Sequence, residues 1–214
     1  MVKKYLIGAL ISIATLGVSA VALANDENPD VAKTYYNRGT AEYNQGNFKA
    51  AARDLSKTIA LEPKAPDAYF NRGLSLRRQH KIDESISDFT QAIKLNQTQA
   101  GYYFERGNAL IVKGDYENAI KDASEAIRLS PQEPQGYFLR GLAFMLSGNF
   151  DKALADSLKA VGIEPEYADA RRLLGETLIK MDKQKSLLPI HSDQLILERK
   201  GIANMSKDFR KMSD

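Results

Sequence analysis

The chain has 214 residues, of which 43% are hydrophobic and 27% charged, a composition typical of a globular protein rather than a disordered or fibrous one. It has no Cys and only two His, which excludes disulfides, Cys nucleophiles and thiolate metal sites, and leaves almost nothing for a His-based zinc site or catalytic triad. Residues 25–179 carry 20 basic and 22 acidic side chains and residues 180–214 carry 8 and 5, so the net charge of +3 describes a near-neutral body with a mildly basic tail and argues against nucleic acid as a partner.

The N-terminal segment, residues 1–24, has the pattern of a secretory signal peptide. A basic start at Lys3 and Lys4 precedes an apolar run from residue 5 to residue 23, which ends in the small-residue site Ala22-Leu23-Ala24. We expect cleavage after Ala24, a short lead-in over residues 25–31, and export of the mature chain to the periplasm or the exterior, with no membrane span left. The alternative is an uncleaved anchor, because an apolar run of this length can just span a bilayer.

A 34-residue period runs through the body of the chain without insertions. Each unit has an Arg-Gly dipeptide, a Tyr three positions before the Arg, and a small residue in its second half. The Arg residues are Arg38, Arg72, Arg106 and Arg140; the Tyr residues are Tyr35, Tyr69, Tyr103 and Tyr137; the small residues are Ala51, Ser85, Ala119 and Ala153. A fixed period of this length predicts a repeat architecture in which each unit buries the apolar face of its neighbour.

Each unit contains two helical patterns, and the unit at residues 100–133 shows them clearly. Tyr103, Gly107 and Leu110 share one helical face, and a second helical pattern starts at residue 116. Gly114 stands between the two, in the position of a left-handed C-cap, and Pro131 follows the end of the second helix. The unit is therefore predicted to be a helix hairpin.

Period and pattern together resemble the tetratricopeptide repeat (TPR) family. The resemblance covers four full units, at residues 32–65, 66–99, 100–133 and 134–167, and continues into residues 168–182, which imitate a further first helix with a polar outer side. It implies an all-α fold: a right-handed α-solenoid of helix hairpins closed by a C-terminal capping helix.

One departure from the family pattern recurs in every unit. The family usually has Leu before its conserved Gly, whereas this chain has Arg each time, and an Asp follows each Arg at a constant separation. Because the two helices of a hairpin are antiparallel, these residues are candidate bidentate ion pairs: Arg38–Asp54, Arg72–Asp88, Arg106–Asp122 and Arg140–Asp156. We interpret them as an internal ladder that fixes helix register; the alternative is a row of Arg side chains displayed for anionic ligands.

The resemblance also implies a concave groove lined by the first helices. One position after each repeated Tyr, the helix has turned about 100° and presents a second set of side chains. The candidate groove residues are Tyr36, Phe70, Leu74, Arg77, Arg78, Phe104, Asn108, Ile111, Phe138, Leu142 and Met145, with Val112 and Leu146 beside them. They suit a peptide with apolar anchors and an acidic flank. The alternative is that the aromatic residues only stack between repeats.

Some members of the family bind the C-terminal carboxylate of chaperones with a clamp of Lys, Asn, Asn, Lys and Arg. The matching positions here hold Tyr36, Thr40, Asn71, Gly101 and Glu105, of which only Asn71 agrees. Glu105 would repel a carboxylate, so this clamp is not expected.

The final residues, 183–214, read as a charged linker followed by an amphipathic helical tail. Apolar side chains recur on one side of that helix, at Leu195, Ile202, Met205 and Phe209. We expect the tail to dock on the C-terminal units of a monomeric protein, with dimerisation as the alternative.

The chain has no glycine-rich phosphate loop, nucleophile elbow or metalloprotease motif, so neither an enzyme nor a cofactor is expected. The hypothesis that remains is a non-enzymatic adaptor that holds a peptide or partner protein in the groove. The alternative is a structural or self-assembling unit whose tail occupies its own or a neighbour's groove.

Overall fold

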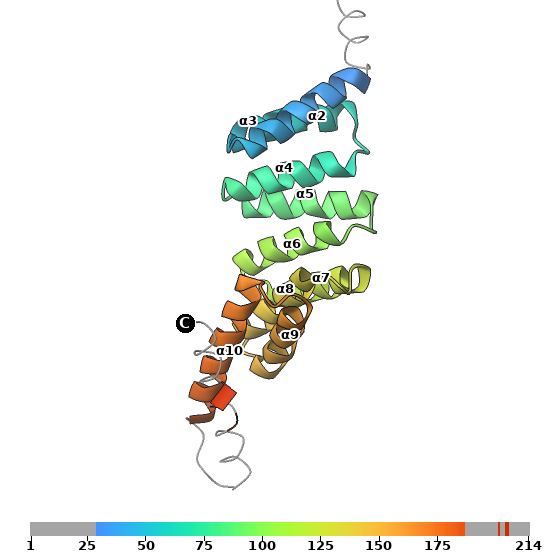
Figure 1. Ribbon diagram of the computed structural model, residues 1–214. Helices are drawn as coiled ribbons and strands as arrows, with labels where there is room; N and C mark the ends of the chain where they lie inside the picture. The colour runs from blue at the N-terminus through green and yellow to red at the C-terminus, as the bar shows by residue number, and fades with distance from the viewer. Residues whose placement is uncertain (1–28, 187–200, 202–203, 206–214) are drawn as a thin grey trace, which may run out of the picture. The chain divides into compact units, whose positions relative to one another are not determined.

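A computed structural model describes residues 29–186, Gly201 and residues 204–205; the expected signal peptide and most of the expected tail lie outside them. The described residues fall into two compact units, divided after Leu95. Unit 1 contains α2 (Pro29–Asn44), α3 (Phe48–Leu61), α4 (Pro66–Arg78) and α5 (Ile82–Leu95) (Figure 1). Unit 2 contains α6 (Ala100–Lys113), α7 (Tyr116–Leu129), α8 (Pro134–Leu146), α9 (Phe150–Ile163) and α10 (Ala168–Ser186). The all-α fold predicted from the period is confirmed.

The helices pair as the repeat predicts. Within unit 1, α2 packs on α3 and α4 on α5, and α3 also contacts α4. Within unit 2, each helix packs on the next, and the first helices α6, α8 and α10 also touch in succession. Every hairpin thus shares its apolar surface with an adjacent hairpin of its own unit, which compensates for the marginal stability of a lone helix pair.

Three of the four hairpin turns are made by a glycine in the left-handed region. Gly46, Gly114 and Gly148 have φ of +82°, +86° and +82°, and Gly114 is the C-cap residue predicted from the sequence. The second hairpin has His80 at the same repeat position, with φ of +62°. A side chain with a Cβ is strained there, because it approaches its own backbone carbonyl.

We expect His80→Gly to raise the free energy of unfolding by about 1 kcal/mol, because glycine removes the left-handed strain at this turn. The reverse change, Gly114→Ala, should lower it by about 1 kcal/mol, since its Cβ meets open space and only the backbone is strained. Urea denaturation of both variants measures the two changes. A loss of stability in His80→Gly would show that the imidazole makes contacts worth more than the strain.

The capping helix is longer than the sequence indicated. The sequence predicts that it ends at residue 182, but α10 continues to Ser186. The added turn contains Lys183 and Gln184, which are good helix formers, so the charged composition that suggested a linker does not end the helix. On its buried side, Leu174, Leu178 and Met181 pack against α9. None of the helices between residues 29 and 186 is long and apolar enough to cross a membrane.

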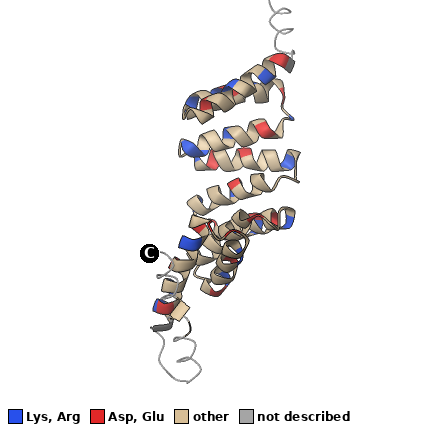
Figure 2. Cartoon of the chain, in the orientation of Figure 1, with Lys and Arg blue, Asp and Glu red and all other residues tan. Residues whose placement is uncertain are grey.

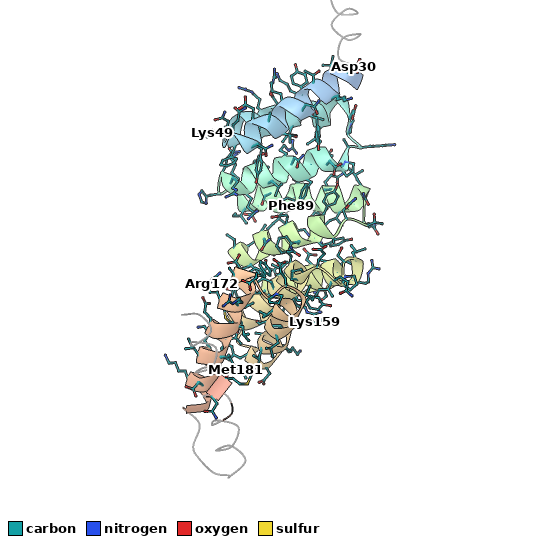
Figure 3. All side chains as sticks on the ribbon, in the orientation of Figure 1. Asp30, Lys49, Phe89, Lys159, Arg172 and Met181 are labelled. Atoms are coloured by element: carbon teal, nitrogen blue, oxygen red, sulfur yellow. The ribbon has the colours of Figure 1, made fainter. Side chains whose placement is uncertain are left out.

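The two units fill the space above the glycine of each Arg-Gly dipeptide in different ways. In unit 1 a side chain of the same hairpin fills this space: a Cβ placed on Gly73 would lie 2.7 Å from the ring of the fully buried Phe89. In unit 2 a side chain of the following first helix fills this space: a Cβ placed on Gly107 would lie 2.7 Å from Leu139. Phe89, labelled on α5 in Figure 3, stands at the repeat position that holds the small residues Ala123 and Ser157 in unit 2.

Whether the filling side chain comes from the same hairpin or from the next first helix decides which positions can be polar. In unit 1, Leu55 fills the space over Gly39, and the matching position on the next first helix holds the polar Asn71. In unit 2, Ala123 is too small to do so, and the matching position on the next first helix holds the fully buried Leu139. The same repeat position is therefore polar on α4 and apolar on α8.

Candidate functional site

All four sequence-predicted Arg–Asp pairs form, each inside one hairpin. Every Arg donates from Nε and Nη2 to the two carboxylate oxygens of its Asp, and the four Asp residues are between 1% and 6% exposed. The paired bonds are Arg38–Asp54 (Nη2 to Oδ1, 3.0 Å), Arg72–Asp88 (both 2.7 Å), Arg106–Asp122 (2.8 and 2.6 Å) and Arg140–Asp156 (both 2.8 Å). These fork-like bonds fix the register of the two helices.

Each Arg of this ladder also lies over the repeated Tyr of its own helix. The guanidinium carbon is 5.2 Å from the ring centre of Tyr35 in the first hairpin and 5.7–5.9 Å in the other three. Two of them reach the preceding hairpin: Arg72 Nη1 donates to Ser56 Oγ at 3.1 Å and Arg140 Nη1 to Ser124 Oγ at 3.3 Å. With their charge already neutralised by a carboxylate, these arginines form a structural ladder rather than a display for anionic ligands.

The hydrogen bonds of the ladder shift the pKa of Asp54 and of the arginines so that the charged form of each is favoured. The hydrogen bond from Arg38 holds the pKa of Asp54 below its ordinary value of 3.8, although burial of the carboxyl acts the other way. The same bonds raise the pKa of Arg72, Arg106 and Arg140, against the opposing effect of their burial. The lowered pKa of Asp54 means that its contribution to stability is present above its ordinary pKa of 3.8 and is lost only as the pH falls through its folded-state pKa.

In each unit we define the first-helix face as the surface on which the remaining candidate residues of that unit lie. In unit 1 its residues are Tyr36, Thr40, Phe70, Leu74 and Arg77, all half-buried, with the exposed Arg78 at its edge. Asn71 Nδ2 donates to the Tyr36 hydroxyl at 2.9 Å. Burial of that hydroxyl raises the pKa of Tyr36. The Phe70 ring packs on Phe89 with 5.8 Å between ring centres, and Arg78 lies 5.9 Å from the ring centre of Phe48.

In unit 2 the first-helix face is apolar and partly open. Phe104, Asn108, Ile111 and Leu142 are half-buried, as predicted for a lining rather than a core. Beside them, Val112 on α6 is 65% exposed, Leu146 on α8 is 42% exposed and Ile179 on α10 is 51% exposed. Ile179 was missed in the sequence, although it stands one full repeat period after Met145.

Two of the candidate groove residues belong to the core instead. Phe138 and Met145 are 9% and 6% exposed and share a hydrophobic cluster with Leu173 of α10. The ring of Phe138 meets Tyr167 edge-on, with 5.5 Å between ring centres. The capping helix and the turn before it cover both side chains, so neither is available to a ligand.

No group of three or more His, Asp or Glu side chains in residues 29–186 is arranged to hold a metal ion. In Figure 2, basic and acidic residues are interspersed along the helices of each unit, which agrees with the near-neutral charge of the body.

A tetratricopeptide repeat family model matches residues 36–100, 72–134 and 104–168, which together span more than half of the chain. A comparison of the sequence with curated proteins finds no significant match.

Several solved structures share the fold at low sequence identity. MamA from Desulfovibrio magneticus RS-1, from residue 41 to its end, is 20% identical with a TM-score of 0.70, over 86% of this chain and 98% of that one. YrrB, described as a TPR protein with an unusual peptide-binding site, is 22% identical with a TM-score of 0.62, over 84% and 97%. The first TPR domain of Spaghetti (RPAP3), bound to the HSP90 peptide SRMEEVD, is 20% identical with a TM-score of 0.53, over 54% and 92%. These structures share the fold, and the family match over the 34-residue hairpins shows that the chain belongs to the tetratricopeptide repeat family.

Proposed function

We propose that this chain is a non-enzymatic interaction module that binds a peptide or a partner protein on its first-helix face. The observation that carries the proposal is the row of exposed aliphatic side chains in unit 2, namely Val112, Leu146 and Ile179 on three successive first helices. Val112 and Leu146 hold the same repeat position and Ile179 holds the one before it, and exposed apolar side chains that gather into a patch mark interaction sites. The half-buried Phe104 and Ile111 beside them supply anchors of the kind in which binding energy concentrates.

The related structures support this use of the fold. YrrB is described by its peptide-binding site, and the RPAP3 domain was solved with a bound peptide. The acidic C-terminus of that peptide does not suit this chain, because Glu105 stands where a carboxylate clamp has a cation. We propose instead a ligand with apolar side chains, held by helix-in-groove or extended-segment contacts and bound by a monomer.

The test uses a peptide selected from a random library against the purified protein, with its affinity measured by fluorescence anisotropy. The double variant Val112→Glu with Leu146→Glu should weaken binding at least tenfold, because it places two charges on the apolar face. Both positions are exposed, so the melting temperature should stay close to that of the wild type. Met145→Glu is unsuitable for this purpose, since it would bury a charge in the core.

The matched control is Leu158→Glu. Leu158 is 44% exposed, similar to Leu146, but it lies on the second helix α9. Its replacement should change the affinity less than twofold. Equal binding by the wild type and the Val112/Leu146 variant would show that the peptide uses another surface.

We also propose that the protein works outside the cytoplasm, on the pattern of residues 1–24. The basic start, apolar run and Ala22-Leu23-Ala24 site predict a mature chain that begins at Asn25. N-terminal sequencing of protein purified from its native host should read Asn-Asp-Glu-Asn. An intact Met1 on membrane-bound material would instead indicate an anchor.

A further inference from the structure

Unit 1 has a second concave feature, away from the first-helix face. A cleft of about 530 Å³ lies among α3, α4 and α5, and none of the first-helix-face residues lines it. Its charged lining consists of Lys49, Arg53, Arg72, Lys81, Glu84 and Asp88. Lys49 is labelled beside the start of α3 in Figure 3.

Half of the positive charge in this cleft is already neutralised. Arg72 is held by Asp88 through two hydrogen bonds, and its third donor group is used by Ser56. Lys81 lies 3.1 Å from Glu84. These two pairs shape the cleft but add no net charge to it.

Two cations remain, one turn apart on α3. Lys49 makes no ion pair with any residue of the described range. The carboxylate nearest to Arg53 is that of Asp54, at 3.8 Å, and both oxygens of Asp54 already accept hydrogen bonds from Arg38. Arg53 itself is 69% exposed. Because residues four apart lie on the same helical face, the two charges point toward the same surface.

In the first hairpin of unit 2, the corresponding positions hold an acidic and a basic residue that neutralise each other. Thirty-four-residue periodicity places Glu117 and Lys121 two repeats after Lys49 and Arg53. Lys121 Nζ lies 2.9 Å from Glu117, so this stretch of α7 carries an ion pair where α3 carries two like charges. Two like charges at this spacing are mutually repulsive in the free protein, and an anionic ligand removes that repulsion.

We propose that this cleft binds an acidic segment of a partner protein, with two carboxylates facing Lys49 and Arg53. A nucleic acid fits less well, because the lining contains no aromatic side chain on which a base could stack and includes Glu84 and Asp88, which repel phosphates. The surface is distinct from the first-helix face, so the chain has two docking surfaces of different chemistry: one apolar, one basic.

The experiment measures the anisotropy of a fluorescein-labelled octapeptide of glutamate, at 50 mM and 150 mM salt, with the glutamine octapeptide as the uncharged probe. Lys49→Glu with Arg53→Glu should weaken binding of the glutamate peptide at least tenfold. The glutamine peptide should not bind. Affinity should fall with added salt, as it does for contacts between exposed charges.

Lys121→Glu with Lys152→Glu is the matched control, because it changes the net charge by the same amount on unit 2. This control should change the affinity less than twofold. The Val112/Leu146 variant should also change it less than twofold, which separates this proposal from the proposal for the first-helix face. The proposal is overturned if the wild type does not bind the glutamate peptide, if both charge-reversal pairs lose binding equally, or if a single-stranded DNA oligomer of equal charge binds more tightly.

Discussion

Replacing Asp122 with alanine should lower the free energy of unfolding by about 3–5 kcal/mol, because it leaves the Arg106 guanidinium without its counter-charge. The Arg106 side chain is 21% exposed, and its Nε and Nη2 donate to Asp122 at 2.8 and 2.6 Å. Water cannot fully replace these bonds at a site packed between two helices. Urea denaturation followed by circular dichroism measures the loss.

A carboxylate on the same helix provides the control. Glu117 is paired with Lys121 at 2.9 Å, a distance similar to that in the buried pair, but its side chain is 82% exposed. Glu117→Ala should therefore cost less than about 1 kcal/mol. Arg106→Met with Asp122→Leu should recover much of the stability, since an apolar pair of similar volume avoids burying either charge. Equal losses for Asp122→Ala and Glu117→Ala would contradict a structural role for the ladder.

Leu139→Ala should cost about 2–5 kcal/mol, because the side chain is completely buried and fills the space over Gly107. In unit 1 the equivalent space over Gly39 is filled from within the hairpin by Leu55. Ala123 has the same repeat position as Leu55, so a leucine at Ala123 should fill the cavity that Leu139→Ala leaves in unit 2. Thermal and urea denaturation give the change in stability.

The test is a double-mutant cycle. Ala123→Leu alone should destabilise by about 1–3 kcal/mol, because it competes with Leu139 for the same space. Together with Leu139→Ala it should cost at least about 1 kcal/mol less than the sum of the two single changes. Ala160→Leu, in the Phe138 cluster, should show no such recovery. Strict additivity of the first pair would mean that the two residues do not share a space.

The 34-residue period was enough to predict the hairpins, because helix geometry and turn chemistry repeat with it. Gly114 could be assigned as a left-handed cap from its place between two helical patterns. The Arg–Asp pairs could be assigned because both members recur together at a constant separation, and an antiparallel hairpin brings such positions face to face. These inferences are local to one hairpin, where sequence separation and spatial separation are closely linked.

The surface could not be assigned in the same way, because it depends on which element covers which side chain. Phe138 has the same repeat position as Tyr36, yet the turn at Tyr167 and the helix after it bury it. His80 stands in line with three glycines, a signal in the sequence that identifies its backbone conformation. The sequence also contains the pattern in which the small Ala123 leaves room for Leu139. This pattern joins two neighbouring repeats, so it is missed when each repeat is considered by itself.

The same pairing of a small side chain with a leucine on the next first helix limits which repeats can be duplicated to lengthen the chain. A second copy of residues 134–167 would place another Leu139 after Ser157, whose small side chain leaves room for a leucine, as Leu173 shows. A second copy of residues 100–133 would instead place Glu105 after Ala123, where a buried apolar side chain is needed. Not every repeat of this chain is therefore an interchangeable building block, and lengthening it by whole 34-residue segments should succeed with the fourth segment and fail with the third.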